Sequence, residues 1–149
     1  TGRKVVLALA GDHAPSFVDH VADKTRTEGN DLQILERSTP FFIWANYPLE
    51  NIDAATSTAD SLNRMDMVML APTIAQQAGL PLTGYYKYLL AMKQQTPVVT
   101  AANDYMKVDG TTGTYGEDES LDAWVKGYLA LEYNNIGAHA KRVQSIFGQ

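Results

Sequence analysis

Apolar residues occur in short runs that are separated by polar segments rich in turn-forming residues. The first run, at residues 4–10, ends at Gly11, and the second, at residues 40–46, is followed by Pro48. Short apolar runs bounded by turn residues are typical of buried strands. We therefore expect strands at these two places and a third, shorter strand at residues 97–101.

Elsewhere the apolar residues recur at spacings of three and four, which predicts helices. This pattern covers residues 16–24, 64–78, 84–94 and 120–131, and a last short helix is expected after Asn135. Thr83 and Ser120 are expected to cap the helices that follow them. Pro72 either begins the second helix or kinks a longer one, and Gly79 is suited to end it. Residues 103–119, which contain Asp109-Gly110, predict a hairpin or loop.

Strands that alternate with helices indicate an α/β fold, here with a small mixed, partly parallel sheet and flanking helices. The length of 149 residues suits a single domain. With 45% hydrophobic and 19% charged residues, the chain can build a core, and the composition argues against disorder. Because Thr1 to Lys4 lead directly into a strand without an initiator methionine, we expect residues 1–149 to be one domain-sized portion of a larger protein.

Charge and cysteine content exclude some classes of function. The net charge is −5 and no run of lysine and arginine occurs, which argues against binding to nucleic acid. The chain has no cysteine, so disulfides, a thiol nucleophile and cysteine-based metal sites are excluded, although the compartment is left open. The sequence shows neither a signal peptide nor a transmembrane segment.

The candidate chemistry lies directly after the first predicted strand, where Asp12 and His13 follow Gly11. A carboxylate oxygen and an imidazole nitrogen are ligands that Zn²⁺ or Mn²⁺ accepts. Adjacent side chains point apart within a strand, but the chain can twist past the strand end and bring both to one point. Ligands of open α/β sheets bind beyond the carboxyl ends of the strands. The alternative is an aspartate that caps the loop beside a solvated histidine.

Several stretches along the chain carry a family resemblance. They are residues 5–16 with Gly-Asp-His-Ala-Pro, residues 39–47, 70–72, 78–82 and 85–90, and residues 121–137. In this order they resemble the C-terminal part of the lipoteichoic acid synthase-like phosphoglycerol transferases, which belong to the sulfatase and alkaline phosphatase superfamily. The polar segments at residues 25–31 and 49–63 lie outside the resemblance. It implies a partial alkaline-phosphatase-like fold that forms the C-terminal portion of a larger extracellular catalytic domain.

The resemblance also implies a metal site. Asp12 and His13 would be two ligands of one divalent cation, Mn²⁺ or Zn²⁺, and an acidic residue and a threonine from the upstream half of the domain would complete it. In the family the threonine, activated by the metal, attacks phosphorus in an anionic lipid head group. A covalent glycerophospho-threonine forms, and a polyol hydroxyl or water then accepts the group.

These implications lead to expectations about this chain by itself. The nucleophile and the first acidic ligand would both lie upstream of Arg3, so we expect no catalytic residue within residues 1–149, weak or absent metal binding, and no activity. The expected partners are the upstream half of the same domain and an anionic lipid, on the extracellular face of a membrane to which upstream helices anchor the parent. An exposed edge of the first strand also favours a homodimer.

Two other functions stay open. One is hydrolysis of a sulfate or phosphate ester, because the superfamily applies the same metal chemistry to several leaving groups. The other is a non-catalytic module that binds a cell-wall polymer. Its contact surface would consist of aromatic side chains, namely Trp44, Tyr47, Tyr85, Tyr86 and Tyr88.

Overall fold

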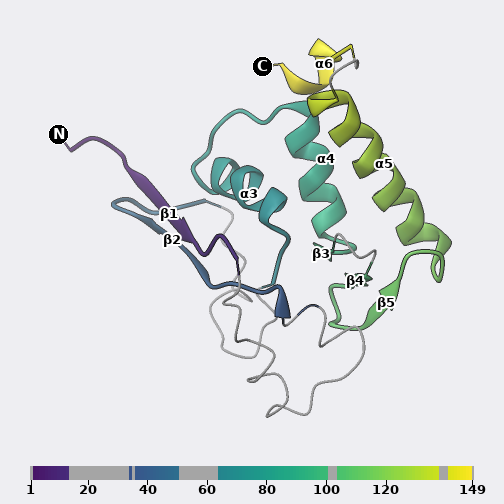
Figure 1. Cartoon of the computed structure of the whole chain (residues 1–149). Helices are drawn as coiled ribbons and strands as arrows, with labels where there is room; N and C mark the ends of the chain where they lie inside the picture. The colour runs from purple at the N-terminus through teal and green to yellow at the C-terminus, as the bar shows by residue number, and fades with distance from the viewer. Residues whose placement is uncertain are drawn as a thin grey trace, which may run out of the picture.

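A computed structural model describes residues 2–13, 34, 36–50, 64–100, 104–137 and 141–148 of the chain. These residues form a mixed α/β structure in which helices lie beside two small antiparallel sheets (Figure 1). The elements are β1 (Val6–Ala10), β2 (Phe41–Ala45), the 3₁₀ helix η2 (Met67–Met69), α3 (Leu70–Gln77), α4 (Gly84–Lys93), β3 (Val98–Val99), β4 (Asp104–Met106), β5 (Thr112–Thr114), α5 (Glu119–Ile136) and α6 (Gln144–Phe147). The predicted α/β class is confirmed.

The sheets differ from the expected single mixed sheet. β1 pairs with β2 in an antiparallel register that runs from Val6 opposite Ala45 to Ala10 opposite Phe41. β3, β4 and β5 form a second antiparallel sheet. The strand predicted at residues 97–101 pairs with β4, its neighbour in the chain, and a connection this short permits only an antiparallel pair. The prediction of a partly parallel sheet is therefore wrong for the described strands.

Most helix boundaries follow the predicted pattern. Thr83 caps α4, since its Oγ1 accepts a hydrogen bond from the backbone N–H of Tyr86 at 3.1 Å. Pro72 lies in the first turn of α3, where a missing N–H breaks no helical hydrogen bond. Gly79, just past the end of α3, has a positive φ of 68°. The cap expected at Ser120 is wrong, because Asp118 caps α5 (see below).

The hydrophobic core lies where α4 contacts η2, α3 and α5. Its buried side chains come from η2, α4 and α5: Met69, Leu89, Met92, Val125 and Tyr128. Figure 1 shows α4 between α3 and α5. α6 closes one end of α4, where buried Phe147 packs on Tyr85 with ring centroids 5.3 Å apart. The last helix, expected directly after Asn135, begins only at Gln144, and Ile136 instead ends α5 and is 77% exposed.

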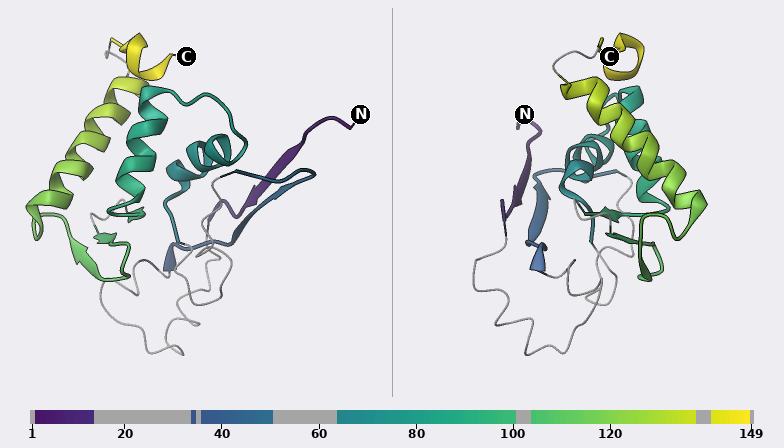
Figure 2. Two further views of the ribbon diagram at one scale, coloured as in Figure 1. Left: turned by 180° about the vertical axis from the view of Figure 1, so that it is seen from behind. Right: turned by 45° about the vertical axis from the view of Figure 1, so that its right-hand side comes forward.

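β1 and β2 lie to one side of the helical layer, as the right-hand view of Figure 2 shows. One face of this pair points toward the helices, whereas the other exposes large apolar side chains. None of the helices that the structure describes is long and apolar enough to cross a membrane. The helix predicted at residues 16–24 and most of the loop predicted at residues 49–63 fall outside the described residues.

Candidate functional site

Gly11 fixes the end of β1 against the start of β2. Its N–H donates to the carbonyl of Pro40 at 3.0 Å, and its own carbonyl accepts from Thr39 Oγ1 at 2.9 Å. A Cβ at this position would lie 2.8 Å from Thr39 Cβ, so only glycine fits without a shift of the backbone. The strand therefore ends at a defined point, and the chain bends at the next two residues.

The bend brings the two predicted ligands together. Asp12 Oδ2 lies 3.5 Å from His13 Nε2, and Asp12 Oδ1 accepts a hydrogen bond from the backbone N–H of His13 at 3.0 Å. Both side chains are largely exposed, 89% for Asp12 and 78% for His13. Two ligand atoms that each lie about 2.1 Å from a tetrahedral ion are roughly 3.4 Å apart. The observed separation fits two ligands of one ion, and it equally fits a carboxylate–imidazole contact without a metal.

Two ligands do not complete a metal site. Within the described parts of the chain, no group of three or more histidine, cysteine, aspartate or glutamate residues is arranged to hold a metal ion. Metals of this kind usually take three or more protein ligands in a catalytic site. The pair at the end of β1 can therefore serve only as part of a larger ligand set.

A cavity of about 550 Å³ opens beside this pair, and Asp12 is one of its lining residues. It lies where the end of β1, the start of β2, the segment before α3 and the end of β3 meet. Its volume suits a small molecule or a head group. Its charged lining residues include Arg37, Arg64 and Asp66, and its apolar lining residues include Phe41 and Val98. Guanidinium groups bind phosphate and carboxylate well, whereas Asp12 and Asp66 bring two negative charges to the same lining.

Asp66 forms the part of the lining that is most firmly held. Its Oδ1 accepts the N–H of Val68 at 3.2 Å, and its own N–H donates to the carbonyl of Pro97 at 2.8 Å. These bonds cap η2 and attach it to the start of β3. Burial raises the pKa of Asp66, and the nearby carboxylate of Glu132 adds to this effect. Asp66 is therefore a structural residue that also lines the cavity.

The cavity residues were not identified from the sequence. Asp66 stands directly before a helical pattern, which is the signal of a helix N-cap and could have been recognised. Arg37 and Arg64 lie in polar segments far apart in the chain, and only the tertiary fold brings both to one cavity.

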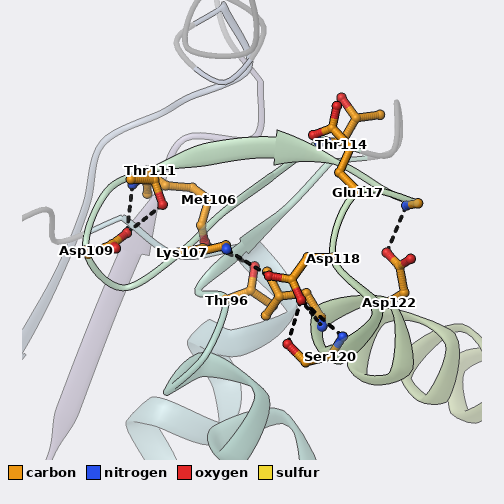
Figure 3. A network of polar contacts seen from close by, with 12 residues as sticks. Thr96, Met106, Lys107, Asp109, Thr111, Thr114, Glu117, Asp118, Ser120 and Asp122 are labelled. Carbon is orange, nitrogen blue, oxygen red and sulfur yellow. Dashed lines mark hydrogen bonds and ion pairs between the residues drawn. The ribbon is translucent and has the colours of Figure 1, made fainter.

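A second group of polar residues joins the β4–β5 hairpin to the start of α5 (Figure 3). Asp118 Oδ2 lies 2.8 Å from Lys107 Nζ, and Asp118 Oδ1 accepts from the N–H groups of Ser120 and Leu121. Lys107 and these donors hold the pKa of Asp118 well below its usual range. Asp122 Oδ1 accepts from the N–H of Gly116 at 2.9 Å. These carboxylates have structural partners, so the group serves to fix α5 on the hairpin.

The aromatic residues considered for a binding module do not form one surface. Trp44 is 52% exposed on the outer face of the β1–β2 pair. Tyr88 instead packs on Trp124 with ring centroids 5.2 Å apart, and its hydroxyl donates to the Trp124 carbonyl at 2.7 Å. Tyr85 packs on Phe147. Two of the five side chains therefore contribute to packing of the helices.

Comparison of the chain with protein-family models, with curated proteins and with solved structures gave no match. A functional proposal therefore depends on the geometry around Asp12 and His13 and on the resemblance of the sequence motifs.

Proposed function

We propose that the chain is the C-terminal portion of a metal-dependent, sulfatase-like phosphoglycerol transferase related to lipoteichoic acid synthase, with a partial alkaline-phosphatase-like fold. The observation that carries the proposal is the 3.5 Å separation of Asp12 Oδ2 and His13 Nε2 at the carboxyl end of β1. Convergent ligands at a strand end, beside a cavity, are a common arrangement for the sites of α/β enzymes.

Each part of this site has a distinct role in the proposal. Asp12 and His13 would hold one Mn²⁺ or Zn²⁺ through an oxygen and a nitrogen, and His13 would have to be neutral to do so. The bound ion would activate a threonine and stabilise charge on phosphoryl oxygens. Arg37 and Arg64 supply positive charge in the adjacent cavity, where an anionic lipid head group would lie.

The remaining parts of the machinery come from outside this chain in the proposal. The upstream half of the same extracellular domain supplies the threonine nucleophile and an acidic ligand, and upstream helices anchor the parent in the membrane. Residues 1–149 contribute metal ligands and no catalytic nucleophile. By itself, the chain is expected to be inactive and to bind Mn²⁺ or Zn²⁺ weakly or not at all.

Titration calorimetry with Mn²⁺ and Zn²⁺ tests the proposal on this chain and on the whole extracellular domain of the parent. In the whole domain, Asp12→Ala combined with His13→Ala should weaken binding by more than about 100-fold, since loss of outer-shell residues alone costs about 10- to 100-fold. Glu119→Gln, which removes an exposed carboxylate from the first turn of α5, is the matched control and should leave affinity unchanged. Unchanged affinity in the double variant would refute the metal role.

Ester hydrolysis is the second candidate, because two guanidinium groups suit a sulfate or phosphate monoester as well as a lipid head group. The two reactions differ in their products. A transferase moves glycerophosphate from an anionic lipid to a polyol acceptor, whereas a hydrolase releases free sulfate or phosphate from a soluble ester. Product analysis with the whole domain separates them.

A further inference from the structure

Both peptide planes that adjoin Gly11 are held by the segment that leads into β2. The plane before Gly11 carries its N–H, which donates to the Pro40 carbonyl at 3.0 Å. The plane after Gly11 carries its carbonyl, which accepts from Thr39 Oγ1 at 2.9 Å. Because a peptide unit is planar, one hydrogen bond to each plane restricts the two torsion angles of the glycine between them. The backbone of Gly11 is therefore held from both sides.

Thr39 is suited to hold one of these planes firmly. Its β-branched side chain has a restricted χ1 torsion, and the proline that follows it confines its backbone to extended conformations. Thr39 is half-buried and lies close to Gly11, since a Cβ added to Gly11 would lie 2.8 Å from Thr39 Cβ. The hydroxyl donor therefore stands on a rigid support, whereas a glycine without such bonds allows the next residue many orientations.

The peptide plane between Gly11 and Asp12 supports the candidate metal ligands, because its orientation sets the direction in which Asp12 leaves the end of β1. From there Asp12 Oδ1 accepts from the His13 N–H at 3.0 Å, and Asp12 Oδ2 lies 3.5 Å from His13 Nε2. The two side chains are 89% and 78% exposed, so packing contributes little to their placement. The Thr39 hydroxyl is thus joined to the two ligand atoms through a short series of backbone contacts.

We infer that Thr39 is a positioning residue for the Asp12–His13 pair and acts through its hydrogen bond to the Gly11 carbonyl. The hydroxyl holds the bend in the arrangement that directs both ligand atoms to one ion, so less order has to be gained when the metal binds. Outer-shell groups that orient metal ligands in this way typically change metal affinity by about 10- to 100-fold. The inference rests on the proposed function, since it requires the pair to bind a metal.

Three substitutions separate the hydroxyl from the rest of the side chain and from general stability. Thr39→Val removes the donor and keeps a β-branched side chain of similar shape. Thr39→Ser keeps the donor, so it should rescue the function that Thr39→Val loses. Thr83→Val is the matched control, because it removes the hydroxyl that caps α4 and lowers stability without touching the bend.

NMR relaxation of this chain without metal measures the order of the bend directly. The backbone N–H groups of Asp12 and His13 should have order parameters of about 0.85 in the native chain and below about 0.6 in Thr39→Val. Thr39→Ser and Thr83→Val should keep values close to the native ones.

Titration calorimetry with Mn²⁺ and Zn²⁺ on the whole extracellular domain measures the consequence for binding. Thr39→Val should weaken affinity by roughly 10-fold, the lower end of the range for outer-shell groups, because it acts through the backbone. Thr39→Ser should retain most of the affinity. Thr83→Val should lower the unfolding midpoint and leave the affinity unchanged.

Unchanged order parameters in Thr39→Val, or equal losses in Thr39→Val and Thr39→Ser, would overturn the inference. An unchanged affinity in Thr39→Val would also overturn it, and the proposed function would still stand if Asp12→Ala combined with His13→Ala abolishes binding. If that double variant instead binds metal as tightly as the native domain, the proposed function fails, even where Thr39→Val shows that the hydroxyl holds the bend.

Discussion

At the scale of single residues, Asp66 couples stability to pH. Burial and Glu132 raise its pKa in the folded state above the ordinary value of 3.8. Between that value and the raised one, the folded state holds more protons than the unfolded state. The contribution of Asp66 to stability is therefore greatest at low pH and falls as pH rises through this window.

Asp66→Asn should remove this dependence, because an amide oxygen can still accept from the Val68 N–H but does not titrate. The free energy of unfolding from urea titrations at several pH values between about 2.5 and 7 measures it. The native chain should lose stability relative to the variant as pH rises. Asp109→Asn is the control with the opposite sign, since hydrogen bonds from Thr111 lower the pKa of Asp109. If the free energy of unfolding changed with pH in the same way for the native chain and for Asp66→Asn, the role given to Asp66 would be contradicted.

Gly11 is the second residue whose role can be tested singly. A Cβ here would lie 2.8 Å from Thr39 Cβ, so Gly11→Ala should force the end of β1 away from the start of β2. Overpacking of this kind costs about 1–3 kcal/mol. Gly2→Ala, whose Cβ would meet nothing within 4 Å, should change stability by less than about 0.5 kcal/mol. Equal unfolding midpoints for Gly11→Ala and Gly2→Ala would show that Thr39 leaves room for a Cβ at position 11.

At the scale of elements, the start of α5 depends on Asp118 more than on Ser120. Asp118 accepts from two backbone N–H groups of the first turn and pairs with Lys107 of the hairpin. Asp118→Ala should lower the thermal midpoint, and Ser120→Ala should lower it less. Because the pKa of Asp118 is depressed in the folded state, its contribution is present above the ordinary aspartate pKa and is lost as pH falls. The difference in thermal midpoint between Asp118→Ala and Ser120→Ala should accordingly become smaller at acidic pH.

This cap also illustrates how far the sequence predicts the fold. Asp118 and Ser120 are both good N-cap residues two positions apart, and a contact with Lys107 from another element favours the first. Local signals, such as Thr83 before α4 or Gly79 after α3, predicted the helix boundary correctly where no group from another element competes for the cap. Sheet pairing is non-local, which explains why single strands were predicted and their arrangement was not. At the candidate site, Asp12 and His13 could be selected from the sequence because they are neighbours directly after a predicted strand. Arg37 and Arg64 of the cavity are far apart in the chain, so no local sequence pattern indicates them.

At the scale of the whole molecule, the structure consists of a helical core and a strand pair that contacts it sparsely. Among the elements that the structure describes, β1 and β2 contact mainly each other, whereas α4 contacts η2, α3, α5 and α6. Amides in elements with few buried contacts exchange with solvent through local opening, at a lower free energy than global unfolding. We therefore expect amides of β1 and β2 to exchange faster than those in the middle of α4.

Hydrogen exchange followed by NMR at low protein concentration tests this expectation and resolves single amides within β1. The bonds from Asn46 N–H to the Val5 carbonyl and from Gly11 N–H to the Pro40 carbonyl show that odd-numbered residues of β1 face β2. In the monomer, the amides of Leu7 and Leu9 should therefore be protected, whereas those of Val6, Ala8 and Ala10 point away from β2. Raising the concentration should protect the even-numbered amides selectively if this other edge of β1 pairs with a second copy. Protection that is uniform along β1 at low concentration would contradict the alternation and show that the edge is covered within one chain.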